Sequence, residues 1–131
     1  MYRFYLSCLV FNLLFRICLS AQAPQKFSYQ AVARDAEGNY LPEKQIGVDI
    51  QIRRGAPAGT LVFREKHTGV QTNKFGLFIL EIGAGIPQSG SIPAIDWENG
   101  PFYLQVGLDP AGGSNYSLQS SSPLLSVPYA L

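Results

Sequence analysis

The feature of the sequence that most constrains the fold is a strict alternation of apolar and polar residues from Gln45 to Arg54, QIGVDIQIRR. Side chains of an extended strand point alternately to its two faces, whereas a helix would distribute the same residues around its circumference. The pattern therefore predicts a half-buried antiparallel strand. Its β-branched residues are expected to face a core: Ile46, Val48, Ile50 and Ile52. Asp49, Gln51 and Arg53 are expected on the opposite face.

Other segments show strand patterns of varying strength. The segment from Phe102 to Asp109 alternates as cleanly, with Tyr103 and Gln105 on the outward face. In the segment from Leu77 to Ile82 both faces are largely apolar, which predicts a central or covered strand. Weaker strand patterns occur at residues 27–33, 61–68, 70–72 and 116–121, and the last of these is polar enough to be an edge strand.

Glycine and proline separate these segments. The chain holds 13 Gly and 9 Pro among 131 residues, of which 47% are hydrophobic and 15% charged. The Gly and Pro content argues against a helical bundle, and the apolar content is too high for a disordered chain. With about seven short strands, the sequence predicts an all-β fold, an antiparallel two-sheet β-sandwich of Ig-like or transthyretin-like type. A closed barrel is the alternative.

The start of the chain has a different composition, with no Gly, Pro or acidic residue in positions 1–20. Arg3 precedes an apolar run, and small residues follow the run at Ser20 and Ala21, which is the layout of a secretory signal peptide. A retained membrane anchor is the alternative. Arg16 argues against the anchor, because a charge inside the apolar run leaves too few uninterrupted residues to span a bilayer.

We therefore expect a signal peptide helix at residues 1–21, followed by a single domain at residues 22–131 with an extended C-terminal tail from about residue 123. The expected location is exported, whether secreted, periplasmic or at the cell surface. No stable membrane span is expected after cleavage of the signal.

Charge and cysteine content narrow the classes of partner and site. Cys8 and Cys18 both lie in the expected signal peptide, so the remaining chain has no disulfide, thiolate metal site or cysteine nucleophile. Ten basic and nine acidic residues give a formal net charge of +1, which provides no electrostatic footprint for nucleic acid.

Three stretches carry a resemblance to a known family: QAPQKFSYQAVARD, TNKFGLFILEIG and LLSVPYAL, at residues 22–35, 72–83 and 124–131. Together they resemble the small β-sandwich domain that follows the signal peptide in many secreted bacterial surface proteins. The resemblance implies a head or spacer domain with no assigned enzymatic activity and no catalytic residues. In longer members the "VPYA" segment leads into collagen-like, coiled-coil or other repetitive regions. The middle stretch is also similar to turns of transthyretin-like and carboxypeptidase-regulatory-like sandwiches.

The residues that could support catalysis are few. His67 is the only histidine, and the residues around it, 64–68, are expected on a solvated strand face. Asp96 and Glu98 flank Trp97, so a glycosidase pair is conceivable, but a loop whose Trp97 closes one end of the sandwich is the simpler interpretation. We predict no catalytic site, no bound metal and no cofactor.

Two loops resemble ligand-binding motifs only in part. Residues 35–39, DAEGN, resemble the start of a calcium loop but lack the distal Glu at the required spacing, so a hairpin turn is predicted. Residues 83–85, GAG, lack the Lys and Ser or Thr of a phosphate loop and are predicted to be a flexible connection.

The expected function is that of a non-enzymatic, exported structural or interaction module of the bacterial cell surface, a head or spacer domain. A carbohydrate-binding or adhesive sandwich is the alternative. Trp97, Tyr103 and Tyr129 are the candidate contacts to a glycan or protein partner. Exposed apolar residues of the C-terminal tail would favour self-association.

Overall fold

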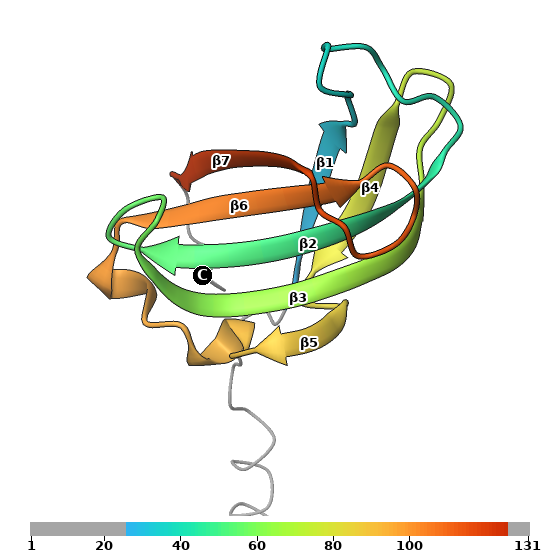
Figure 1. Ribbon diagram of the computed structural model, residues 1–131. Helices are drawn as coiled ribbons and strands as arrows, with labels where there is room; N and C mark the ends of the chain where they lie inside the picture. The colour runs from blue at the N-terminus through green and yellow to red at the C-terminus, as the bar shows by residue number, and fades with distance from the viewer. Residues whose placement is uncertain (1–25, 126–131) are drawn as a thin grey trace, which may run out of the picture.

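The computed structural model describes residues 26–125, so the expected signal peptide helix lies outside the described residues. Seven strands and two short 3-10 turns make up this part of the chain (Figure 1). The strands are β1 (Phe27–Val32), β2 (Gln45–Arg54), β3 (Thr60–Gln71), β4 (Leu77–Ile82), β5 (Ile86–Ser89), β6 (Phe102–Asp109) and β7 (Leu118–Leu124). The 3-10 turns are η1 (Ile92–Ala94) and η2 (Trp97–Asn99).

The strands are arranged in two antiparallel sheets. The small sheet pairs β1 with β4, and the large sheet has the order β5-β3-β2-β6-β7. The small sheet crosses one face of the large sheet, which we call its inner face, and the opposite face is its outer face (Figure 1). The predicted all-β, two-sheet architecture is thus confirmed for the described residues.

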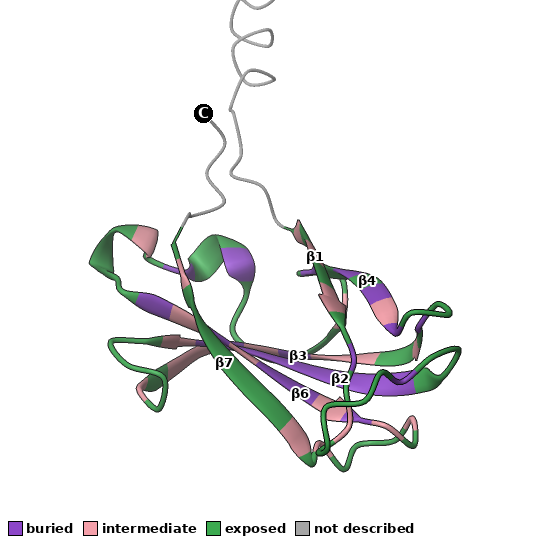
Figure 2. Ribbon diagram, turned by 90° about the horizontal axis from the view of Figure 1, so that it is seen from above, coloured by how far each residue is buried: buried purple, intermediate pink, exposed green. Residues whose placement is uncertain are grey.

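The core lies between the sheets, as the alternation in β2 predicts. Ile46, Val48, Ile50 and Ile52 are all 0% exposed, and the apolar face of β6 lies beside them. The small sheet contributes Phe78 and Leu80 from β4, and the turn η1 contributes Ile92. Buried residues accordingly follow β2, β6 and β4 in Figure 2. Burial of β-branched and aromatic side chains from both layers is what stabilises the sandwich.

The prediction of separate strands at residues 61–68 and 70–72 is wrong, because β3 runs through both. Thr68 and Gly69 together lie opposite Gly47 of β2, which is a β-bulge. Gly69 has a φ of +64°, a left-handed conformation that glycine adopts without a steric penalty. The glycine therefore bends and twists the strand instead of ending it.

Residues 83–85 form the predicted connection, and they lead directly into β5, a strand that the sequence pattern did not indicate. Two other predictions need correction. The prediction of a covered β4 is wrong, because Ile79 on its outward side is 64% exposed. The last strand, β7, begins and ends later than residues 116–121 and includes Pro123 and Leu124, which we expected in the tail. Proline lacks the N–H that a ladder needs, and its tolerance here fits the position of β7 at the edge of the large sheet.

The predicted hairpin turn at residues 35–39 is confirmed. Oδ1 of Asp35 accepts hydrogen bonds from the backbone N–H groups of Asn39 at 2.9 Å and Glu37 at 3.0 Å, and Arg34 forms a β-bridge with Tyr40. The N–H of Asn39, helped by that of Glu37, holds the pKa of Asp35 below its usual range. The aspartate oxygens that a calcium loop would offer to the ion are therefore engaged by the turn itself.

Candidate functional site

The outer face of the large sheet carries the candidate site. The side chains of β2 that do not face the core, those of Asp49, Gln51 and Arg53, lie on this face, as the alternation predicts. The first two are nevertheless only 3% and 9% exposed. They lie on the central strand of the sheet, between β3 and β6, so that long side chains of both neighbours cover them. Their burial requires that every polar group be paired.

Hydrogen bonds across β3 and β2 satisfy the carboxylate of Asp49. Nε of Arg64, on β3, donates to its Oδ1 at 2.9 Å, and Nε2 of Gln51 donates to its Oδ2 at 2.8 Å. The pair of Arg64 and Asp49 joins a side chain that is 37% exposed to one that is 4% exposed. The negative charge of Asp49 is therefore compensated within the protein.

Arg53 is held in a different way. Its guanidinium donates to Oε1 of Gln51 at 2.7 Å, to Oε1 of Gln105 at 3.2 Å and to the carbonyl oxygen of Gly59 at 3.0 Å. All of these acceptors are neutral, and no ion pair within residues 26–125 includes Arg53. The side chain is fixed in place while its positive charge has no carboxylate partner among the described residues.

The hydrogen bonds continue from Arg53 to the edge of the sheet. Nε2 of Gln105, on β6, donates to Oε1 of Gln119 at 2.6 Å, and Nε2 of Gln119, on β7, donates to the carbonyl oxygen of Tyr116 at 3.2 Å. Because a guanidinium can only donate, Arg53 determines which end of the Gln105 amide faces it, and this in turn orients Gln119. We call the connected side chains the outer-face network: Asp49, Gln51, Arg53, Arg64, Gln105 and Gln119.

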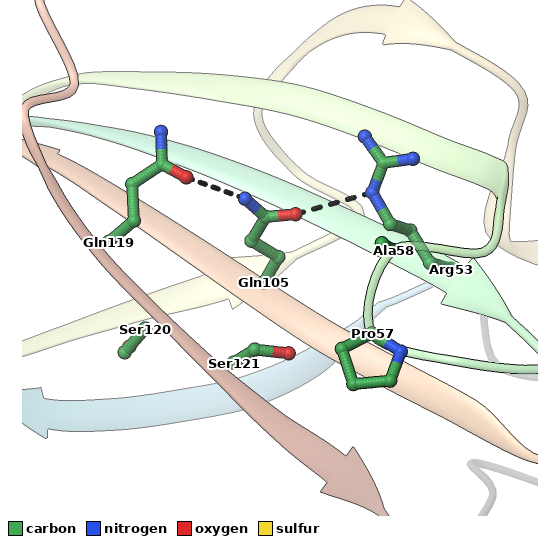
Figure 3. Close-up of a pocket in the computed structure, with 7 residues that line it drawn as sticks. All are labelled: Arg53, Pro57, Ala58, Gln105, Gln119, Ser120 and Ser121. Atoms are coloured by element: carbon green, nitrogen blue, oxygen red, sulfur yellow. Dashed lines mark hydrogen bonds between the residues drawn. The ribbon is translucent and has the colours of Figure 1, made fainter.

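A shallow groove of about 510 Å³ lies beside this network, between the loop that joins β2 to β3 and the edge strand β7. We call it the outer groove, and it is lined by Arg53, Pro57, Ala58, Gln105, Gln119, Ser120 and Ser121. Figure 3 shows Arg53, Gln105 and Gln119 in a row, linked by hydrogen bonds, with Pro57 and Ser121 beside them. A preorganised row of donors and acceptors beside an open groove is suited to binding a polar ligand.

The candidate contacts expected from sequence lie apart from one another. Tyr103 is half-buried and pairs with Arg53 of β2, and its place in the alternation of β6 puts it on the outer face. Trp97 is also half-buried, but its ring packs edge-on against the ring of the core residue Phe102, on the inner side of the sheet. The two ring centroids are 5.1 Å apart. Trp97 thus has the core-closing position of the simpler interpretation. Tyr129 lies outside the described residues.

The surroundings of His67 differ from the solvated face that we expected. Glu65, two positions earlier on β3, is 2% exposed, and its two carboxylate oxygens accept the backbone N–H of Gly83 at 2.9 and 3.0 Å. Nε2 of His67 contacts the same carboxylate, and its side chain is 11% exposed. The expectation fails because Glu65 and His67 share the inward face of β3 with Phe63.

The remaining candidate carboxylates are engaged locally. Asp96 and Glu98 are exposed around η2, and Asp96 accepts a hydrogen bond from the side chain of Asn99. Asp109 accepts the N–H groups of Ala111 at 2.9 Å and Asn115 at 3.0 Å, and the first of these contributes most to lowering the pKa of Asp109. Within residues 26–125 no hydrogen bond joins any two of His67, Asp96, Glu98 and Asp109.

Part of the site was visible in the sequence. The alternation placed Gln51, Arg53 and Gln105 on outward faces, yet it gave no reason to select them. The alternation of apolar and polar residues does not show that β2 pairs with β6 and β6 with β7. These pairings bring together residues as far apart in sequence as Arg53 and Gln105. The useful signal was a set of hydrogen-bonding side chains on the polar face of strong strands.

No protein family model matches this chain, and comparisons with curated proteins and with solved structures found no match either. In the part of the chain that the structure describes, no helix has the length and apolar character needed to cross a membrane. The same residues contain no group of three or more His, Cys, Asp or Glu that could hold a metal ion. In its described residues the protein is a two-sheet β-sandwich with a polar groove on one face.

Proposed function

We propose that this chain is an exported, non-enzymatic interaction module of the bacterial cell surface, a head or spacer domain that binds its partner through the outer groove. Export is supported by the composition of residues 1–20 and by the small residues that follow them. Surface location is supported by the resemblance of the stretches at residues 22–35, 72–83 and 124–131 to domains of secreted bacterial surface proteins.

The observation that carries the proposal is the outer-face network beside an open groove. A domain that acts only as a spacer needs a stable core, which the inner face supplies. A binding module also needs polar groups that are already in place, because ordering flexible side chains on binding reduces affinity. Gln105 and Gln119 are fixed by hydrogen bonds at 3.2 and 2.6 Å, and both line the groove.

The start of β1 and the end of β7 lie on the side of the molecule opposite the outer face, which is consistent with binding at the outer groove. In Figure 2 the start of β1 and the end of β7 point to the same side of the molecule as the turns η1 and η2. The small sheet also lies on that side. The ends of the described segment therefore lie away from the outer face, and a module attached to other structures through them could present its groove.

The non-enzymatic part of the proposal is supported by the roles of the acidic groups. Asp49 is hydrogen-bonded to Arg64 and Gln51, Glu65 caps the N–H of Gly83, and Asp109 closes the turn after β6. Each carboxylate thereby stabilises the fold. A general acid or base would need a carboxyl group that reaches a substrate proton.

A glycan array tests the proposal with the full-length chain. We expect binding to at least one class of saccharide, and we expect the pair of changes Gln105→Ala and Gln119→Ala to abolish it. The matched control is Gln30→Ala on the exposed side of the small sheet, which should leave binding unchanged. Binding that survives loss of both groove glutamines would overturn the proposal, as would cleavage of a bound saccharide during incubation.

A further inference from the structure

The outer groove offers a positive charge that nothing in the described protein neutralises. Arg53 is surrounded by neutral acceptors, and the nearest acid of the outer-face network, Asp49, is already bound to Arg64 and Gln51. Each terminal nitrogen of the guanidinium uses one hydrogen for Gln51 or Gly59 and retains a second. In Figure 3 both terminal nitrogens point away from Gln105.

A carboxylate is the group that best complements such an arginine. Its two oxygens accept two N–H groups of a planar guanidinium, and bonds of this kind are shorter and stronger than neutral ones. Because Arg53 is held by three hydrogen bonds, little side-chain entropy would be lost when the ligand binds. The chemistry of the site therefore favours an acidic ligand over a neutral one.

The rest of the groove favours a sugar over a peptide. An extended peptide binds best where a strand edge offers free backbone groups. The groove is bordered by the edge strand β7, but its floor at Gln105 belongs to β6, which is paired on both sides. Side chains supply the polar contacts instead. Gln105 and Gln119 are both donors and acceptors, as are the vicinal hydroxyls of a sugar, and Ser121 adds a hydroxyl.

The apolar parts of the groove fit the same ligand. Pro57 and Ala58 form one wall of the groove, and Tyr103, which is outside the lining of the groove, is the register partner of Arg53 on the neighbouring strand. Aromatic rings with a polar tip are suited to contacts with a C–H face of a sugar ring. The volume of about 510 Å³ is within the range of small-molecule sites, about 300–1,000 Å³.

We propose that the outer groove binds a saccharide that carries a carboxylate, of the hexuronate class, with the carboxylate on Arg53 and the ring hydroxyls on Gln105 and Gln119. This inference rests on the proposed function and specifies the class of its ligand. The interaction is a reversible one, in which the carboxylate completes the hydrogen bonding of Arg53.

Calorimetric titration of the full-length chain with digalacturonate and with its methyl ester tests the inference. The ester keeps the ring hydroxyls but has no charge, so we expect it to bind about tenfold more weakly or worse, as for loss of a charged hydrogen bond. Arg53→Lys keeps the charge but not the planar geometry and should weaken binding of digalacturonate by a similar factor. Arg54→Ala, at the exposed next residue, is the matched control and should bind as the unchanged chain does.

Ser121→Phe is a second variant, which fills the groove without removing a member of the outer-face network, and it should abolish binding while thermal unfolding stays unchanged. Equal affinity for acid and ester would overturn the inference, and tighter binding of an acidic peptide would also do so. If neutral saccharides bind and the glutamine changes abolish that binding, the proposed function survives and only the carboxylate assignment fails. Absence of binding to every saccharide would reject both.

Discussion

At the scale of single residues, the least expected feature is a buried carboxylate on β3. Glu65 is 2% exposed and accepts the N–H of Gly83, which ties the loop after β4 to the large sheet. The charged residues around Glu65 predict a solvated face, but the alternation along β3 places Glu65 on the same inward face as Phe63. Gly85 leaves room for this arrangement, since a Cβ there would lie 2.7 Å from Nε2 of His67.

We expect Glu65→Ala to lower the free energy of unfolding by about 1–3 kcal/mol, because the N–H of Gly83 loses its acceptor inside the protein. Glu65→Gln keeps an acceptor oxygen and should cost less. Urea unfolding of the full-length chain measures both. Glu81→Ala is the control, since its ion pair with Lys26 is about half exposed and should contribute at most about 1 kcal/mol. Equal losses for Glu65→Ala and Glu81→Ala would contradict the structural role of Glu65.

Asp109 gives the protein an acid-sensitive turn. The N–H groups of Ala111 and Asn115 hold the pKa of Asp109 below its ordinary value, so the folded state favours the ionised form. The resulting stabilisation is present above the unfolded pKa of about 3.9 and is lost as the pH falls through the lower folded pKa. Asp109→Asn should remove this dependence. The unfolding midpoints of the unchanged chain and of Asp109→Asn, measured from pH 6 to pH 2.5, should therefore differ at pH 6 and converge at low pH. A difference between the two midpoints that stays constant with pH would contradict this role of Asp109.

At the scale of elements, strong alternation predicted strands accurately. The bounds of β2, β4 and β6 agree with the predicted segments, because each has one side of apolar residues that packs on the core. The sequence pattern did not predict two features, β5 and the continuous strand β3. β5 has only exposed residues and contains Pro87, so no core-facing pattern marks it. The sequence pattern predicts a break in the middle of β3, but the strand continues there through a bulge at Gly69.

The bulge in β3 can be tested at Gly69. A Cβ there would meet only Nε2 of Gln45, at 3.5 Å, so a substitution is penalised by conformation and not by a clash. At a φ of +64° we expect Gly69→Ala to lower the free energy of unfolding by about 1–2 kcal/mol. Gly69→Asn is the matched variant and should lose less, because asparagine tolerates this conformation. If chemical denaturation gives Gly69→Asn a lower free energy of unfolding than Gly69→Ala, the left-handed conformation of Gly69 in the bulge is contradicted.

At the scale of the whole molecule, the large sheet separates an apolar face from a polar one. Which residues face outward could be predicted from sequence, but which of them meet could not. Arg53 and Gln105 are joined only through the pairing of β2 with β6, and no local pattern determines that register. Trp97, the most conspicuous aromatic residue of the sequence, lies against Phe102 and away from the outer groove.

Export is a prediction about the chain as a whole. Mass spectrometry of the protein recovered from the cells that produce it naturally should find a mature N-terminus near Ala21 or Gln22, in a secreted, periplasmic or surface fraction. Recovery of the chain from the inner membrane with Met1 still attached would instead identify a retained anchor.

Self-association through the C-terminal tail is tested with a truncation that spares the sheet. Because β7 extends to Leu124, the deletion must begin after Leu125, which is 91% exposed. Light scattering should show that removal of residues 126–131 reduces association while the melting temperature stays the same. An unchanged mass distribution would exclude these residues as the contact.

We propose that this domain binds its ligand on the outer face of the large sheet. Nuclear magnetic resonance titration of the isotope-labelled chain with digalacturonate tests it most directly, because each residue reports separately. We expect the largest shifts on the side chains of Arg53, Gln105 and Gln119, with little change at Trp97. Shifts centred on Trp97 and η2, with the side chains of the outer groove unaffected, would contradict it.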